Sequence, residues 1–414
     1  MPFPQADLTG PAGGVFPGVF LMPAMTTVSR SFKAETIADD LARGLALPSL
    51  SKALGLLSCS PETDCRQMIS LLQDALPFPV VGGTTWALPF ESPDDDLSAS
   101  LTVIDRENLN FAISVSPVLN QKVGLRQMAQ LYRDCETELG ERPKLLLAMM
   151  PMTSKLMADQ YMPFLFEAAE GIPVFGGMVS DDYHSGRATV LVEGGAFSDR
   201  MVLVGLGGDI APVFAARCEL NVLSEYMPTV TEAEGYVVRR VDDMSFCDYV
   251  ARQGFDPTRE DLTADWPLSL EVRGRHVPIA GLTDVCDLVA LNPAEGSGTL
   301  AGIVPVGSGI RMGVLSKSDI MKTTEGCLAD ILAQIKNERA AGHRYSVLFC
   351  LPCVARYFAM VGDDNQEGER IRSACPDDLG LFGYYGFNEI SPVRLPGGGQ
   401  ENRIMNYSII MCAF

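Results

Sequence analysis

The side chains best suited to chemistry lie near the end of the chain, where strand-like segments carry polar groups that an apolar core does not need. Glu389 stands within Phe387–Pro392, and Asn406 stands within Ile404–Ile409. A buried carboxylate or amide must be hydrogen-bonded or ion-paired, and Arg356 is one candidate partner. The three side chains either form an internal polar clasp or line a ligand site. In such a site Arg356 binds a carboxylate, Glu389 binds an amine, and Asn406 binds either.

A second candidate is the C-x-x-C pair Cys350 and Cys353, at a predicted strand-to-helix junction. A helix N-terminus lowers the pKa of a thiol, so the pair allows a redox couple or a thiolate metal ligand. With 11 cysteines in the chain, a chance spacing of two buried thiols is the simpler interpretation. An enzyme that uses Cys353 as nucleophile, or Glu389 as acid or base, stays a further alternative.

Histidines are scarce, which limits metal and haem chemistry. The chain has three, and none has metal-ligand spacing to another histidine or to a cysteine pair. His184 follows a short acidic loop that begins at Asp181, and it is the first candidate if haem or a metal binds. A surface histidine is the simpler interpretation. The sequence also has no Gly-x-Ser-x-Gly elbow and no P-loop.

Two glycine pairs recur at equivalent places. Gly82 and Gly83 follow one predicted strand, and Gly176 and Gly177 follow another. Glycine permits positive φ or close approach of the backbone to a ligand. The pairs are therefore expected either as tight turns or as amide cradles for a carboxylate or phosphate, with Asp181 close to the second pair.

These glycines belong to an internal repeat of the form strand–helix–strand–Gly-Gly–strand–strand, at about 50–118 and 143–207. Apolar spacing predicts a helix at about 62–76 in the first copy. A third strand–helix–strand unit follows near the C-terminus, with a helix at about 354–373, and a long amphipathic helix precedes it at 318–339.

We therefore expect a mixed α/β (α+β) protein, in which repeated strand–helix–strand–strand units form two mixed β-sheet domains. A change of composition near 228–234 places these domains at 1–228 and 229–414.

Composition narrows the function classes. Apolar residues make up 47% of the 414 residues, and the formal net charge is −20. Such a charge disfavours nucleic acid and anionic membrane surfaces as partners. The N-terminus lacks a basic signal-peptide start, and the apolar run at 15–22 is too short and too broken by proline and glycine to span a bilayer. With mostly free thiols expected, the sequence predicts a cytoplasmic protein.

Six segments together resemble the FIST family of bacterial sensory and signal-transduction proteins, which has an N-terminal and a C-terminal domain. The segments are Pro79–Gly83, Pro173–Gly177 with Asp181, Gly235–Val238, Cys353–Arg356, Phe387–Pro392 and Asn406–Ser408. The chain departs from the family at the position before Glu389, where Asn388 replaces a usual glycine. It also has Met405, Asn406 and Ser408 where the family usually has His-Asn and a later Thr.

The resemblance implies an intracellular sensor rather than an enzyme. It implies an amino acid or small organic acid as ligand, without a cofactor, and a separate signalling partner such as a histidine kinase. The expected ligand-binding residues are Arg356, Glu389, Asn406, the four glycines and Asp181. Some family members are similar to haem-binding nitric-oxide sensors, so a haem or thiolate-metal sensor, with His184, Cys350 or Cys353 as ligands, is the alternative.

Overall fold

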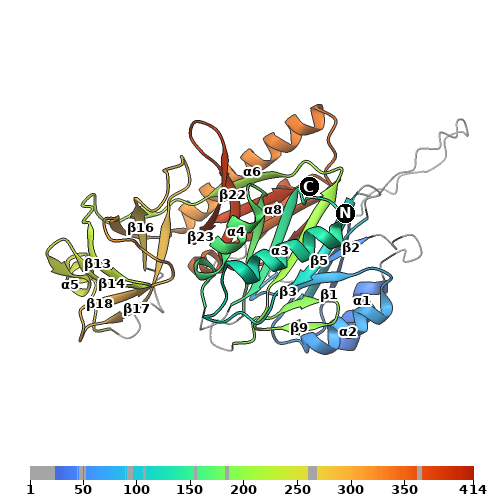
Figure 1. Ribbon diagram of the computed structural model, residues 1–414, viewed down its shortest axis with the longest axis horizontal. Coiled ribbons are helices and arrows are strands. Elements are labelled where there is room, and N and C mark those ends of the chain that lie inside the picture. The colour runs from blue at the N-terminus through green and yellow to red at the C-terminus, as the bar shows by residue number, and fades with distance from the viewer. Residues whose placement is uncertain are drawn as a thin grey trace, which may run out of the picture.

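The computed structural model describes residues 24–43, 45, 50, 53–88, 90, 97–105, 109–152, 156–181, 186–259, 268–360 and 366–414. As expected, it is a mixed α/β structure. Three sheets share one core, and a fourth sheet forms a lobe at the side of this body (Figure 1). Within the described residues, helices that combine the length and the apolar character needed to cross a bilayer are absent.

The body consists of three units with one order of elements: edge strand, helix, central strand, helix, then two further strands. Unit I comprises β1 (Met25–Ser29), α1 (Ala34–Arg43), β2 (Leu54–Cys59), α2 (Cys65–Ala75), β3 (Val80–Thr84) and β4 (Ala99–Ile104). Unit II comprises β5 (Leu109–Val115), α3 (Leu125–Leu139), β6 (Leu145–Pro151), α4 (Met162–Ala169), β7 (Val174–Val179) and β10 (Val202–Gly208). Unit III comprises β11 (Val213–Arg217), α6 (Lys317–Ala340), β20 (Val347–Pro352), α7 (Val354–Ala359), α8 (Gln366–Ala374), β21 (Gly380–Gly383) and β24 (Ile409–Ala413).

Strand pairing is the same in all three units. Each central strand (β2, β6, β20) lies between a parallel neighbour (β3, β7, β21) and an antiparallel neighbour (β4, β10, β24). The edge strand (β1, β5, β11) then pairs antiparallel with that last strand. The body is therefore a threefold repeat, and its third copy is the unit that the sequence places near the C-terminus.

The repeat is divided differently from the sequence-based assignment. The run Phe111–Val115 was assigned to the first copy, but β5 pairs with β10 and opens unit II. The predicted second copy at 143–207 also includes β8 (Val190–Val192) and β9 (Gly195–Phe197), but these strands form a hairpin that joins the sheet of unit I beside β3. Likewise, the hairpin of β22 (Gly386–Arg394) and β23 (Gln400–Met405) leaves unit III and pairs with β7. Hairpins thus interlock neighbouring units, a relation that local patterns do not reveal.

The central strands are apolar on both faces. In β2, Leu54 and Leu56 join the core shared by the three sheets, while Leu57 and Cys59 pack outward against α1 and α2. The same alternation holds in β6 and β20, whose outer faces are covered by α3 with α4 and by α6 with α8 (Figure 1). Continuous apolar runs in the sequence are the signature of strands covered on both sides.

The helices begin at side-chain caps. The Asp64 carboxylate accepts a hydrogen bond of 3.0 Å from the Gln67 amide at the start of α2, and Ser316 with Asp319 forms a capping box at the start of α6. Both helices match their predicted positions within a few residues. The helix predicted at 354–373 is instead two helices, α7 and α8.

The glycine pairs lie within strands and do not form turns. Gly82 and Gly83 are in β3, and Gly176 and Gly177 are in β7. A Cβ atom on Gly82 would stand 1.8 Å from the Leu57 carbonyl oxygen of the central strand. Gly176 and Gly383 occupy the equivalent places in the other units. A Cβ atom added there would stand 1.9 Å and 2.0 Å from the carbonyl oxygen of the paired residue in the central strand. The parallel strands can therefore pair only because these positions lack a side chain.

The lobe is an insertion between β11 and α6. It contains β12 (Asn221–Val222), β13 (Val230–Glu234), β14 (Val237–Val241), β15 (Met244–Ser245), α5 (Phe246–Arg252), β16 (Leu268–Arg273), β17 (Val285–Asn292), β18 (Ser297–Leu300) and β19 (Gly309–Val314). Figure 1 shows it beside the body. The predicted boundary at residues 228/229 falls inside this lobe, and chain segments on both sides of that boundary build the body.

Gly82→Ala should lower the free energy of unfolding by about 1–3 kcal/mol, the usual cost of forcing extra atoms into a packed core. Gly326→Ala in α6 is the matched control, because its Cβ would stand 3.6 Å from Arg217 Nε, an ordinary contact. Urea denaturation of both variants measures the difference. Equal stability of the two variants would contradict the steric role of Gly82.

Candidate functional site

The segment between β23 and β24 gathers the three predicted side chains. Asn406 accepts a hydrogen bond from Asn388, the Tyr407 carbonyl accepts one from Arg356, and Ser408 donates one to Glu389. Three consecutive residues therefore contact the groups that the sequence analysis singled out. The residues of strand β22 and helix α7 meet here because β22 returns beside β7 and α7 follows the central strand β20.

Glu389 is fully buried in β22. Its Oε2 accepts a hydrogen bond of 2.8 Å from Ser408 Oγ, whereas its Oε1 has no hydrogen-bond partner within the described part of the chain. Loss of hydration raises the pKa of this carboxyl to about 8, and hydrogen bonds from Ser408 and Cys353 only partly offset the shift. Near neutral pH the group can therefore carry a proton.

Asn388 provides a second unpartnered acceptor beside Glu389. Its Nδ2 donates to Asn406 Oδ1 at 2.9 Å, while its own Oδ1 is buried and has no partner among the described residues. Asn388 has φ of 45°, in the left-handed region where the family usually has glycine. Such backbone strain persists only where surrounding structure or function requires it.

The same segment joins the body to the lobe. Asn406 Nδ2 donates to the Val285 carbonyl at 3.3 Å, and Tyr407 Oη donates to Asp287 Oδ1 at 2.6 Å, both in lobe strand β17. Desolvation raises the pKa of Asp287 to about 6. The polar cluster of Glu389, Asn388, Asn406 and Ser408 therefore lies at the joint between body and lobe.

Arg356 has a structural role in this arrangement. It is fully buried, and Nε and Nη2 donate to Glu367 Oε1 at 2.9 and 2.6 Å. Nη2 also lies within hydrogen-bond distance of the Ile320 carbonyl, Thr323 and Thr324 in α6. The guanidinium thus holds α6, α7 and α8 together through Glu367, and its contact with the last strands is a hydrogen bond of 3.2 Å to the Tyr407 carbonyl.

The cysteine pair does not have the environment of a reactive thiol. Cys350 and Cys353 are both buried, and burial is the largest cause that raises the pKa of each thiol well above its ordinary value. Cys353 stands at the N-cap of α7, next to Glu389, whose charge raises the pKa of the thiol further.

Groups of three or more side chains arranged to hold a metal ion are absent from the described residues, and His184 lies outside them.

Gly176 and Gly177 lie beside this cluster, because β7 pairs with β22 and Gly176 is opposite Ile390, the residue after Glu389. Asp181 lies beyond the end of β7. Asp181 is buried, and its Oδ2 accepts hydrogen bonds from the Arg187 and Ala188 amides, which closes its own loop. Nearby, Ser180 Oγ donates to the Tyr385 carbonyl at 2.6 Å, and the Tyr385 amide donates to Thr85 Oγ1 at 3.0 Å. These contacts link units I, II and III, and the sequence analysis did not anticipate them.

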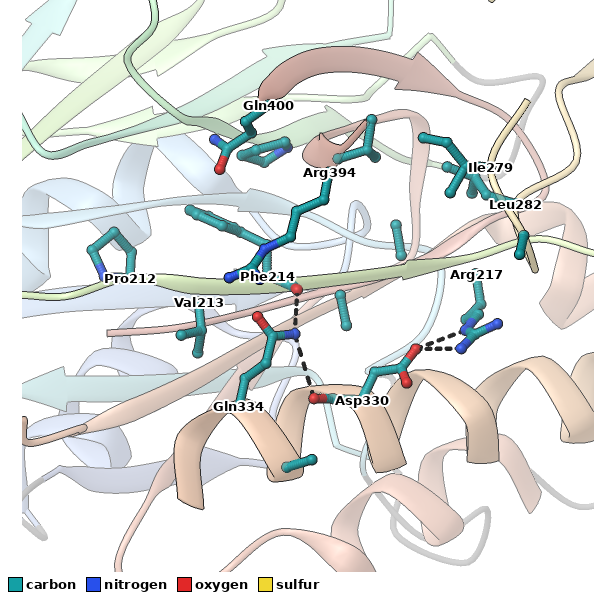
Figure 2. A pocket seen from close by; sticks show the side chains of 16 residues that line it. Pro212, Val213, Phe214, Arg217, Ile279, Leu282, Asp330, Gln334, Arg394 and Gln400 are labelled. Atoms are coloured by element: carbon teal, nitrogen blue, oxygen red, sulfur yellow. Dashed lines mark hydrogen bonds and ion pairs between the residues drawn. The ribbon is translucent and has the colours of Figure 1, made fainter. Parts of the chain in front are cut away.

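An open pocket of about 420 Å³ lies near the polar cluster, between β11, α6 and the β22–β23 hairpin (Figure 2). Figure 2 shows Arg394 reaching from the end of β22 towards Phe214, opposite Asp330 and Gln334 of α6. Arg217 pairs with Asp330 at 2.6 Å, and Gln334 donates to the Phe214 carbonyl at 2.8 Å. Sequence reasoning missed this pocket because its walls come from segments far apart in the chain.

Pocket and cluster share structural elements. β22 carries Glu389 near its start and Arg394 at its end. Cys218, which follows Arg217 of the pocket wall, donates a hydrogen bond of 3.5 Å to the Asn406 carbonyl. The pocket and the polar cluster are therefore connected through β22 and through the neighbouring residues Arg217 and Cys218.

Replacing Arg356 by Met should cost about 3–5 kcal/mol of stability, because it leaves the Glu367 carboxylate buried without its ion-pair partner. Arg370→Met is the control, since Arg370 pairs with Glu325 at 3.3 Å on an exposed surface between α8 and α6, and such pairs contribute less than about 1 kcal/mol. Chemical denaturation of the two variants tests this. Similar losses would show that the Arg356 clasp is not structural.

The Glu389 carboxyl should make stability depend on pH. Its folded-state pKa of about 8 exceeds its unfolded value of about 4.3, so the folded protein holds the proton more tightly. Its contribution is complete below about pH 4.3 and is lost as pH rises towards about 8, by up to about 1.4 kcal/mol per unit. Wild type should therefore lose stability relative to Glu389→Gln between about pH 5.5 and 7.5. The free energy of unfolding of both proteins is measured by denaturation at several pH values. If it changes with pH by the same amount in both, the raised pKa of Glu389 is contradicted.

Comparison with known proteins places most of the chain in two known domain types. Residues 53–244 match the FIST N domain, and residues 246–392 match the FIST C domain. No curated protein matches the sequence with significance. Among solved structures, the chain is similar to a cyanuric acid hydrolase from A. caulinodans, with 12% identity and a TM-score of 0.26, over 47% of this chain and 72% of that chain. A likeness at that TM-score carries no argument about fold or activity.

Proposed function

We propose, from the premise that the chain belongs to the FIST family, that it senses a small ligand bearing an amine, with an amino acid as the simplest example. FIST domains are associated with small-ligand sensing in signal transduction. One observation carries the choice of ligand class. Two buried acceptor oxygens on adjacent residues, Glu389 Oε1 and Asn388 Oδ1, have no hydrogen-bond partner among the described residues, although Ser408 and Cys353 bond the Glu389 carboxyl.

An ammonium group supplies what these oxygens lack. A buried acceptor without a partner costs about 1–3 kcal/mol, more when it is charged. An ammonium has three donors and a positive charge, so it can bond Glu389 Oε1 and stabilise the ionised form of Glu389. A simple organic acid would add further acceptors at this place. The amine is therefore the better supported of the two ligand classes expected from the sequence.

The position of the cluster supports a signalling mechanism without catalysis. Asn406 and Tyr407 contact the lobe strand β17, so a ligand at Glu389 acts where the lobe joins the body. We propose that binding shifts the lobe relative to the body and that a separate partner, such as a histidine kinase, recognises the shifted state. A ligand shifts such an equilibrium only by its difference in affinity for the two states.

The same proposal places the protein in the cytoplasm. All 11 cysteines are free thiols, and free thiols are typical of a reducing compartment. The raised pKa of Cys353 supports sensing over nucleophilic catalysis. A haem-bound form would depend first on His184.

A thermal-shift screen with amino acids, amines and organic acids tests the ligand class. A ligand at ~100 times its dissociation constant adds about 2.7 kcal/mol of stability. For a domain of roughly 200 residues this raises the melting temperature by roughly 5–10 °C. Amines and amino acids should raise the melting temperature of wild type, and Glu389→Gln should abolish the effect. Shifts with organic acids alone would overturn the proposal.

Two further measurements locate the site. Because the amine binds ionised Glu389, affinity should rise with pH between about 6 and 8, by up to tenfold per unit, with proton release on binding. Titration calorimetry in two buffers of different ionisation enthalpy measures that release. Arg394→Ala in the open pocket is the matched control. If it abolishes binding and Glu389→Gln does not, the ligand occupies the pocket of Figure 2 and the proposed site is wrong.

A further inference from the structure

Two cysteines outside the proposed ligand site lie close together. Cys59 ends the central strand β2, Cys65 begins α2, and their Sγ atoms are 3.9 Å apart. The turn of residues 60–64 brings them together, and the Asp64 cap fixes the start of the helix. A disulfide has an S–S distance of about 2.05 Å, so the two sulfur atoms need to approach by about 2 Å.

Cys65 differs from every other thiol of the chain. It is half-buried, and its pKa is lowered, chiefly by the hydrogen bond with Cys59. The pKa of each of the other ten thiols is raised, by the hydrogen bond with Cys65 in the case of Cys59 and by burial in the rest. Cys65 is thus the most easily ionised thiol, at the N-terminus of an 11-residue helix.

A pocket of about 290 Å³ adjoins the turn that links the two cysteines, although the cysteines themselves do not line it. The turn residues Ser60, Pro61 and Glu62 form one wall, and Thr85 and Trp86 form another. The Thr85 amide donates to the Cys59 carbonyl at 2.8 Å, which ties the second wall to the cysteine pair. Both walls of the pocket are thus joined directly to the segment that holds the two cysteines.

We propose that Cys59 and Cys65 are a site of reversible oxidation by hydroperoxides, and that their disulfide reshapes the adjoining pocket. The Cys65 thiolate attacks the peroxide and the O–O bond breaks, which produces a sulfenic acid. The leaving oxygen takes up the proton that Cys65 lost and departs as water or an alcohol. Cys59 then attacks the Cys65 sulfur, the S–O bond breaks, and the hydroxide takes the Cys59 proton and leaves as water. The two sulfur atoms supply the two electrons that reduce one peroxide. Two small-molecule thiols, such as glutathione, then reduce the disulfide to two thiols and are themselves oxidised to a disulfide.

Peptide mapping of the full-length protein tests the proposal without any variant. The reduced protein is treated with limiting hydrogen peroxide, alkylated under denaturing conditions and digested. Because both cysteines lie between Lys52 and Arg66, the digestion uses a protease that cleaves after Glu62, and the expected product links the peptides that contain Cys59 and Cys65, with a loss of two hydrogen atoms. Cys375 is the internal control, because it is also half-buried but burial raises its pKa to about 11. Oxidation of Cys375 before the pair, or no linked peptide, would overturn the proposal.

Two variants then separate the steps. Cys59→Ser keeps a hydrogen-bond donor beside Cys65 but cannot form the disulfide, so it should leave Cys65 as a sulfenic acid that dimedone traps. Cys65→Ser should leave Cys59 unmodified. Cys375→Ser should leave the linkage unchanged. The outcome is independent of amine binding at Glu389, so failure of either proposal leaves the other intact.

Discussion

The body depends on one constraint: its three central strands are apolar on both faces. Neither face of β2, β6 or β20 can meet water, so each sheet needs a helical layer outside and other sheets inside. Three sheets that face one another satisfy this need at once, because the inner face of each covers the inner faces of the others. Exchanged hairpins close the arrangement, since β8 joins the sheet of unit I and β22 joins the sheet of unit II.

Much of this fold could be predicted from the sequence because its signals are local. Apolar runs indicate the buried strands, and capping residues with helical spacing indicate α2 and α6. The partition of the repeat could not be predicted in the same way. Phe111–Val115 has the same alternation whether it ends one unit or begins the next, and only its pairing with β10 decides. The glycine pairs show a similar limit, because a turn and a close strand contact both favour glycine.

The site shows what polarity alone can indicate. Glu389, Asn406 and Arg356 stood out as polar groups in apolar surroundings, and the structure brings all three to the segment Asn406–Ser408. Which of these side chains has a structural role, and which has an oxygen without a partner, depends on contacts that the sequence does not reveal. Arg356 meets Glu367 from a helix whose separate existence was not expected. Asn388, which the sequence showed only as a departure from the family, carries a buried oxygen that has no hydrogen-bond partner among the described residues.

The lobe enters and leaves the body through neighbouring strands, since Asn221 in β12 pairs with Val314 in β19. An insertion whose two ends lie side by side can change in length and shape while the surrounding repeat keeps its register. The connection between β11 and α6 is thus a modular attachment point. Lobes of different sequence at this position would give one conserved body different specificities, which offers a route to diversification by exchange of a single segment.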